Sequence, residues 1–212
     1  MSTPSEPIVD DYAIPPAEDG LAPVLSTIPT TQPVVFLGID DGAFRDPSVV
    51  ALMREQHIHA SLFLADSFLG GDYAFFKQLT ELGSVVEPHT LRHDTNMAVK
   101  SYEYQKAEIC GMADIVEQQY GRRPTLFRPP GGGYSTTMRR AAHDCGMKAI
   151  ITWIAKANGG SMQYQYGDHL QPGDIVLMHF RPEFSDDMHA FLDAVNAAGL
   201  RIELLESIPG AM

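Results

Sequence analysis

The stretch Val34-Val35-Phe36-Leu37-Gly38-Ile39-Asp40-Asp41-Gly42 joins a run of apolar residues directly to two carboxylates. Four consecutive apolar residues, 34–37, that end at a glycine are typical of a buried strand. The two aspartates, Asp40 and Asp41, follow this strand at once. The stretch therefore predicts a buried strand with two acidic groups at its C-terminal end.

On both sides of this stretch the chain alternates between strand patterns and helix patterns. The predicted strands are 34–37, 60–64, 84–87, 126–128, 149–153, 174–178 and 201–205, and the predicted helices are 47–56, 73–81, 101–120, 135–145 and 186–198. Repeated β–α units indicate parallel strands with helices packed outside them. About seven strands are too few for a closed eight-stranded barrel, which typically takes ~250 residues. An α/β fold is expected, either as an incomplete barrel or as a doubly wound open sheet.

Composition narrows the broad class of protein. The chain has 212 residues, of which 44% are hydrophobic, and its 27 acidic and 15 basic residues give a net charge of −12. This length suits one domain with a buried core. The acidic balance argues against nucleic acid and anionic lipid as partners, because both attract basic surfaces. No run of 18 apolar residues is present, so we expect no insertion into a membrane.

The first 32 residues differ in composition from the rest of the chain. They contain six prolines and five acidic residues, and the first basic residue is Arg45. This composition is typical of an extended segment. We therefore expect residues 1–32 to form a Pro-rich, acidic and partly ordered arm, and residues 33–212 to form the functional domain. The first residues show neither the basic nor the apolar region of a signal peptide, which leaves open a cytoplasmic protein or one whose export segment is missing from this chain.

Polar and aromatic side chains occur at the ends of the predicted strands. In both candidate architectures the active site lies at the C-terminal ends of parallel strands. The residues that end or follow strands in this way are Asp40, Asp41, His89, His93, Arg128, Trp153 and His179. We therefore expect them to meet along one edge of the sheet.

Two histidines four residues apart, His89 and His93, form a candidate metal-binding pair. They share one face if the segment is helical, although two solvated loop histidines explain the pair alone equally well. The aspartate pair alone is also common in turns and helix caps. Together, two imidazoles and one carboxylate make the ligand set of a catalytic divalent metal with open positions. Such a metal lowers the pKa of its water, and the second aspartate would be free to take the proton.

The remaining candidates each have a structural alternative. Three glycines, 131–133, after Arg128-Pro129-Pro130 would let a ligand approach the backbone closely, or would form a simple flexible turn. His179 follows an apolar strand, where a lone histidine is usually a core residue. Trp153 alone is likewise more often part of a core than of a binding site.

The motifs occur in the order Asp40-Asp41-Gly42, His89-Thr90-x-x-His93, Arg128-Pro129-Pro130-x-Gly132, Trp153 and Leu177-x-His179. This order resembles the polysaccharide deacetylase family, also called the NodB-homology or carbohydrate esterase family 4 group. The resemblance covers nearly the whole domain, from about residue 34 to residue 205. It implies a distorted, incomplete (β/α) barrel of about seven parallel strands with outer helices. It also implies a hydrolase that removes acetyl groups from N-acetylglucosamine polymers such as peptidoglycan or chitin.

The resemblance implies a role for each matched residue. The implied metal ligands are Asp41, His89 and His93; the implied catalytic residues are Asp40 as general base, His179 as general acid and Arg128; the implied substrate-binding residues are Gly131, Pro130, Trp153 and Leu177. The backbone N–H of Gly131 would help to hold the oxyanion. The implied metal is zinc, with cobalt or nickel as alternatives, and the implied partner is an acetylated polysaccharide.

Three positions depart from the family's usual pattern. Gly131 stands where a tyrosine is usual, Gly38 where a threonine is frequent, and Lys156 where an aspartate commonly orients the arginine. Without that aspartate, Arg128 needs another carboxylate, and the candidates are Asp168, Asp174 and Glu183. The departures favour metal binding over fast turnover. They keep open a non-catalytic relative that binds metal and glycan, and an acetylxylan esterase is a further alternative.

The two cysteines, Cys110 and Cys145, lie in helices that successive β–α units would place side by side. A disulfide between them is one interpretation, and two buried free thiols are the other. A disulfide would indicate an oxidising compartment, as would a substrate in the cell wall. We therefore expect an extracellular or cell-envelope protein, whose export signal is absent from this chain.

Overall fold

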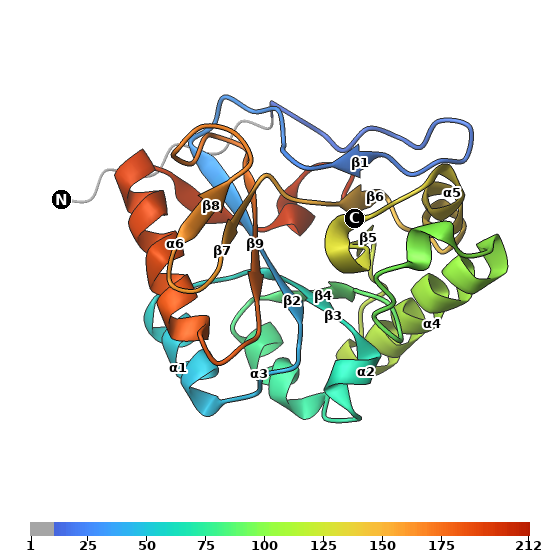
Figure 1. The fold of residues 1–212 in the computed structure, drawn as a ribbon, viewed down its shortest axis with the longest axis horizontal. Coiled ribbons are helices and arrows are strands. Elements are labelled where there is room, and N and C mark those ends of the chain that lie inside the picture. Colours follow the sequence, from blue (N-terminus) through green and yellow to red (C-terminus); the bar gives the residue numbers. More distant parts are fainter. Residues whose placement is uncertain (1–10) are drawn as a thin grey trace.

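A computed structural model describes residues 11–212, and the part of the expected arm formed by residues 1–10 lies outside this description. The strands are β1 (Val24–Leu25), β2 (Val34–Asp41), β3 (Ser61–Leu64), β4 (Val85–Pro88), β5 (Leu126–Phe127), β6 (Ala149–Ile151), β7 (Ala155–Ala157), β8 (Met162–Tyr164), β9 (Ile175–His179) and β10 (Arg201–Glu203). The α-helices are α1 (Pro47–Glu55), α2 (Asp66–Leu69), α3 (Ala74–Glu81), α4 (Tyr102–Tyr120), α5 (Thr136–Asp144) and α6 (Phe184–Ala198). Figure 1 shows their arrangement.

The larger sheet is built around β2, whose eight residues are all buried. Its strands follow the order β4-β3-β2-β9-β7-β8, and β10 pairs with the first residues of β2. All of these pairings are parallel except the one between β7 and β8. Burial on both faces explains why the apolar run of β2 is continuous rather than alternating.

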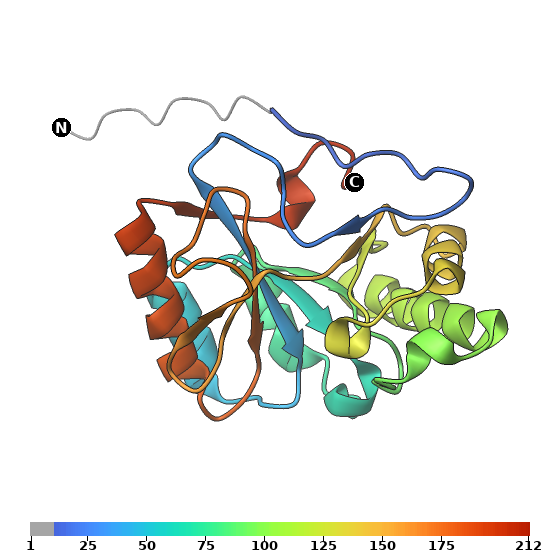
Figure 2. The same ribbon diagram turned by 45° about the horizontal axis from the view of Figure 1, so that its top comes forward.

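A smaller sheet of three parallel strands has the order β1-β6-β5. Its first strand comes from the N-terminal segment, where Val24 and Leu25 pair with Ile150 and Ile151. Figure 2 shows this segment running past the C-terminus of the chain. Leu25 and Ile28 are buried, so this part of the segment is packed against the rest of the protein.

The strands within residues 11–212 form two open sheets and no closed one. The α/β class and the parallel strands are confirmed, whereas the strands of these residues are divided between two sheets instead of forming the expected incomplete barrel. The expected number of strands is too low, because β1, β7 and β8 are also present. These three strands have only two or three residues each, and segments so short carry no hydrophobic periodicity.

Helices cover the outside of the sheets. In Figure 1, α6 and α1 lie beside one end of the larger sheet, and α4 and α5 lie together next to the smaller one. Asp46 caps α1, as its position before Pro47 predicts, because its carboxylate accepts from the Ser48 N–H at 2.9 Å. Cys110 of α4 and Cys145 at the end of α5 form a disulfide, with their Cα atoms 5.1 Å apart. Within residues 11–212, no helix is long and apolar enough to cross a membrane.

Buried Glu87 fixes the place where the two sheets meet. Its side chain accepts from Arg122 Nη1 at 2.9 Å and from the backbone N–H groups of Thr125 and Leu126. Glu87 lies in β4, and the other three residues lie just before or within β5. The carboxylate therefore holds the ends of β4 and β5 together, so that the loops after them face the same space.

Candidate active site

A cavity of about 520 Å³ opens at the C-terminal ends of β2 and β9. Its volume falls within the range of small-molecule sites, roughly 300–1,000 Å³. The predicted site residues that line it are Asp40, Asp41, His89, His93, Gly131, Trp153, Leu177 and His179. Arg128 and Pro130 are buried and do not line it. The sheet topology thus brings most of the predicted residues to one edge.

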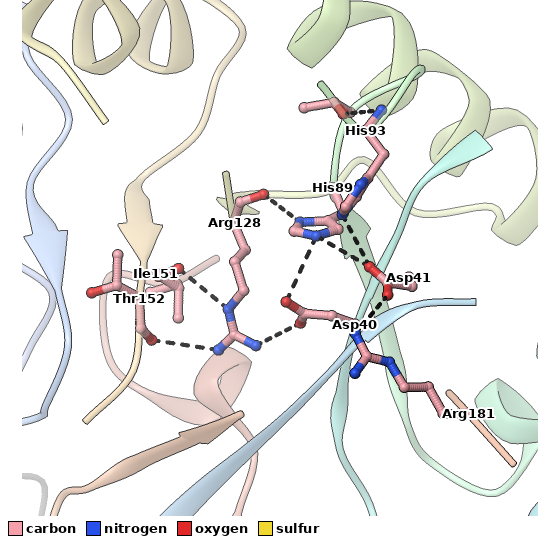
Figure 3. A network of polar contacts seen from close by, with 9 residues as sticks. Asp40, Asp41, His89, His93, Arg128, Ile151, Thr152 and Arg181 are labelled. Atoms are coloured by element: carbon pink, nitrogen blue, oxygen red, sulfur yellow. Dashed lines mark hydrogen bonds and ion pairs between the residues drawn. The ribbon is translucent and has the colours of Figure 1, made fainter. Parts of the chain in front are cut away.

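Asp41, His89 and His93 bring one carboxylate oxygen and two ring nitrogens within 4.8 Å of one another. Asp41 Oδ1 lies 3.1 Å from His93 Nε2 and 3.6 Å from His89 Nε2 (Figure 3). This oxygen is buried and finds no well-aligned hydrogen-bond donor among residues 11–212. A buried acceptor that faces two ring nitrogens fits a shared divalent cation.

The orientation of His89 also fits a metal ligand. Its Nδ1 lies 2.7 Å from the carbonyl oxygen of Arg128. Because a carbonyl only accepts, Nδ1 carries the proton and Nε2 keeps its lone pair toward Asp41. Burial lowers the pKa of His89 to about 3, so the ring is neutral at pH 7, which is the form that binds metal. The residues present therefore fit a divalent ion.

A loop, rather than one face of a helix, presents the two histidines. His89 and His93 lie after β4 in a segment without regular structure, where the His93 N–H donates to the Thr90 hydroxyl at 3.0 Å. Asp41, Thr90 and His93 have φ values of 79°, 75° and 56°. Positive φ is uncommon for residues with a side chain. Such backbone strain clusters at functional sites, where the surrounding structure holds it in place.

The side chain of Arg128 is fully buried, and each of its three nitrogens donates a hydrogen bond. Its Nη1 donates to Asp40 Oδ1 at 2.7 Å, and its Nε donates to the carbonyl oxygen of Ile151 at 3.3 Å (Figure 3). The guanidinium packs over the ring of Phe63, 4.1 Å from its centre. A buried, stacked and hydrogen-bonded guanidinium has one fixed position, and it fixes the carboxylate of Asp40 as well.

The partner of Arg128 differs from the expected candidates, which were Asp168, Asp174 and Glu183. The guanidinium pairs with Asp40 instead. Gly38 makes this pairing fit, because a Cβ at that position would lie 2.4 Å from Arg128 Nη1. The guanidinium of Arg128 therefore occupies the space that a side chain at residue 38 would fill.

Burial is the main influence on the other ionisable groups of the cavity. It raises the pKa of Asp40 to about 7, against the opposing effect of Arg128. It lowers the pKa of His179 to about 4. Burial also acts to raise the pKa of Asp41, but its interactions with the neighbouring imidazoles, that with His93 first, outweigh burial and lower this pKa. At pH 7, Asp41 is therefore ionised and His179 is neutral.

The remaining predicted residues lie around this polar centre. His179 is the register partner of Asp40 across β2 and β9, and Leu177 lines the cavity on the same strand. Gly132 has a φ of 76°, and a Cβ there would lie 2.8 Å from the Trp153 ring. The glycine at 132 thus lets the backbone pass under the indole, and Gly131 reaches the cavity beside it.

Part of the cavity wall escaped prediction from the sequence. The additional lining residues are Thr95, Ala155, Lys156, Asn158, Gln163, Tyr164, Gln165 and Arg181, of which only Lys156 was noted, as a departure. Most of them belong to the hairpin of β7 and β8 or directly follow it. Gly159-Gly160 between the two strands is the turn signal that could have indicated this hairpin.

The chain is similar in sequence to known proteins. Residues 27–150 match the family model described as polysaccharide deacetylase. The chain is 39% identical over 203 residues to an uncharacterised protein of Streptomyces coelicolor. This alignment covers 91% of this chain and 81% of that protein. It is also 26% identical over 161 residues to a peptidoglycan-N-acetylglucosamine deacetylase of Bacillus cereus. That alignment covers 72% of this chain and 75% of that protein.

Solved structures support the same fold. A chitin deacetylase from the fungal pathogen Colletotrichum lindemuthianum matches with a TM-score of 0.75 at 17% identity, covering 92% of this chain and 94% of that one. A pseudoenzyme of carbohydrate esterase family 4 from Bacillus anthracis matches with a TM-score of 0.71 at 18% identity, covering 84% of this chain and 66% of that one. At such identities the likeness concerns the fold alone. The family model spans more than half of the chain, and with the sequence relatives it shows that the chain belongs to the polysaccharide deacetylase family.

Proposed function

We propose that the protein is a metal-dependent hydrolase that removes acetyl groups from polysaccharide containing N-acetylglucosamine. The observation that carries this proposal is the presence of two units in one cavity. One is the Asp41–His89–His93 set, and the other is the carboxylate of Asp40 held by Arg128. Metal ligands and a positioned base are what the hydrolysis of an amide by water requires.

Asp41, His89 and His93 would hold the metal through one oxygen and two ring nitrogens. When bound, a divalent ion such as zinc, cobalt or nickel supplies Lewis-acid chemistry to a carbonyl and lowers the pKa of water. Two imidazole ligands favour these ions over magnesium and calcium, which prefer oxygen ligands.

Asp40 would take the proton of the attacking water. Its pKa, raised by burial to about 7, suits a general base that works near neutral pH. Arg128 occupies Oδ1 and leaves Oδ2 on the side of the metal ligands, 3.7 Å from His89 Nε2. Arg128 therefore acts through Asp40, as a positioning residue rather than a catalytic one.

His179 would give a proton to the leaving nitrogen. Because its pKa of about 4 leaves the ring neutral before the reaction, the proton must reach it during the reaction. Asp40, its register partner on the next strand, is the neighbouring group that would gain a proton. The Gly131 N–H would donate to the carbonyl oxygen, and the ring of Trp153 would wall the space for the acetyl methyl group.

The best supported substrate is a cell-wall or chitin-like polymer. The B. cereus relative is described as a peptidoglycan-N-acetylglucosamine deacetylase, and the site residues suit the amide of an N-acetyl group. We also propose that the protein works outside the cytoplasm. The Cys110–Cys145 disulfide supports this location, since disulfides persist in oxidising compartments.

A second candidate is a non-catalytic relative that binds metal and glycan. Lys156 and Gly131 favour it, because they stand in the cavity where the family usually has an aspartate and a tyrosine. This candidate shares the metal ligands and the cavity with the first, and it differs only in the absence of turnover.

The test is acetate release by the full chain after its metal content has been measured. The substrates are N-acetylglucosamine oligomers, peptidoglycan and acetylxylan, each with zinc, cobalt or nickel added and, in parallel, with a chelator. We expect metal-dependent acetate release from at least one amide-containing polymer. Release from acetylxylan alone would instead support an esterase, and bound metal without release from any substrate would support the non-catalytic relative.

A further inference from the structure

The cavity that contains the Asp41–His89–His93 set also contains two basic side chains. Lys156 lies in β7 and Arg181 lies two residues beyond the end of β9, and both line the cavity. They come close enough to His179 for both positive charges to contribute to the lowering of its pKa, after the larger effect of burial. The proposed reaction leaves both cations without a role.

Lys156 is half-buried in the wall of the cavity. Its Cα pairs with Leu177 on β9 and with Gln163 on β8, so the residue sits in the sheet wall rather than on a mobile loop. Within residues 11–212, no carboxylate oxygen lies within 4.0 Å of its Nζ. Within residues 11–212 this ammonium group is therefore left available to an anion that enters the cavity.

Arg181 is also poorly matched by the protein. Its nearest carboxylate oxygen is Asp41 Oδ2 at 3.9 Å, and the side chain is 46% exposed. Asp41 is shared at the same time with the rings of His89 and His93. The guanidinium therefore keeps donors free for a ligand in the cavity.

Few acidic residues in the cavity offset the charges of Lys156 and Arg181. The only acidic residues that line it within the described chain are Asp40 and Asp41, and Arg128 already neutralises Asp40. The whole chain carries a net charge of −12, yet this cavity lacks an excess of negative charge. A local concentration of positive charge in a cleft attracts anionic ligands.

We propose that the substrate carries a carboxylate close to the acetamido group, and that Lys156 and Arg181 bind it. This inference rests on the proposed deacetylase function and narrows its substrate class from neutral amino sugars to carboxylate-bearing ones. Asn158, Gln163 and Gln165 on the same wall supply amide groups for sugar hydroxyls. A neutral N-acetylglucosamine unit would use the amides and the acetyl pocket but would leave both cations unpaired.

The experiment compares two sugars that differ by the charge of one carboxylate and the methyl group that masks it. One is the disaccharide of N-acetylglucosamine and N-acetylmuramic acid, which has a carboxylate next to an acetamido group, and the other is its methyl ester. The metal-loaded full chain is assayed for kcat/KM on both by acetate release, and calorimetry gives the affinity for both. We expect the acid to be favoured about fivefold, as for one partly exposed ion pair, and the preference to fall as salt is added.

Three lysine variants test whether Lys156 causes the preference for the acid over its methyl ester. K156M keeps the length of the side chain without its charge and should lower the acid-to-ester ratio, with the remainder due to Arg181, whereas K156R should restore it. K77M removes an exposed lysine of α3 outside the cavity and should leave the ratio unchanged. Equal affinity for acid and ester in the unaltered protein, or an undiminished ratio in K156M, would overturn the inference. Absence of acetate from either sugar would refute the deacetylase function, while the calorimetric ratio would still decide the role of Lys156.

Discussion

Arg128 Nη1 and Asp40 Oδ1 lie 2.7 Å apart, although 88 positions separate the two residues in the chain. Both side chains are almost completely buried. The pairing joins the loop after β5 in the smaller sheet to the end of β2 in the larger one. A group proposed to act as a base is therefore fixed by a contact between the two sheets.

Replacing Asp40 by asparagine should abolish the base and preserve the fold. The amide oxygen of the new side chain still accepts from Arg128, but the amide takes no proton from water, so we expect acetate release to fall by about 10²- to 10⁴-fold. Metal content, measured by mass spectrometry on the native protein, should stay at the level of the unaltered protein. An active D40N variant would show that another group is the base.

Replacing Arg128 by methionine should destabilise the protein strongly. Removing one partner of a buried ion pair leaves the other uncompensated, which typically costs ~3–5 kcal/mol. The midpoint of urea denaturation measures this loss. In D40N/R128M the loss should be smaller than the sum of the two single losses, because the two groups contact each other. Additive losses would show that the 2.7 Å contact contributes little.

The parts of the site that could be predicted from the sequence are those set by local pattern and sheet topology. The apolar run before Asp40 indicates a buried strand, and polar residues after parallel strands meet at one edge. That rule alone brings Asp41, His89 and His179 into one cavity, as the structure has them. The residue types, carboxylates and imidazoles, then indicate that the cavity can hold a metal and transfer protons.

The parts that escaped prediction depend on contacts between distant segments. Nothing near Arg128 in the chain indicates that its partner is Asp40, since the pairing depends on Gly38 being free of a side chain. The helix considered for His89 and His93 is wrong, because positive φ at Thr90 and His93 bends the segment into a loop. The β7–β8 hairpin was missed because each strand has only three residues.

Replacing His89 by alanine should remove most of the bound metal. Loss of a direct ligand should weaken metal affinity by more than the roughly 10- to 100-fold typical of losing an outer-shell partner. His169 provides the matched control, because its side chain is 66% exposed and lies outside the cavity. H169A should bind metal as the unaltered protein does. Equal metal content in H89A would mean that the ligand set is assigned incorrectly.

Removing the disulfide should lower stability without changing the site. The bridge closes a loop with a sequence separation of 35, for which the chain-entropy model gives a stabilisation of about 4 kcal/mol. The C110A/C145A variant should therefore unfold at lower urea concentration, and a reducing agent should shift the unaltered protein but not the variant. Two thiols that react with an alkylating agent in unreduced protein would contradict the bridge.

Replacing Gly38 by alanine tests whether the arrangement of Arg128 and Asp40 needs an empty position. The new Cβ would lie 2.4 Å from Arg128 Nη1, so the guanidinium must move, and overpacking of a buried site typically costs ~1–3 kcal/mol. Displacement of the guanidinium also releases Asp40, so acetate release should fall while the metal ligands, which do not touch Gly38, keep the metal. The matched control is G133A, where φ is −72° and the nearest atom to a new Cβ is 4.0 Å away. If G38A is as stable and as active as G133A, then Arg128 can shift freely and is not what positions the base.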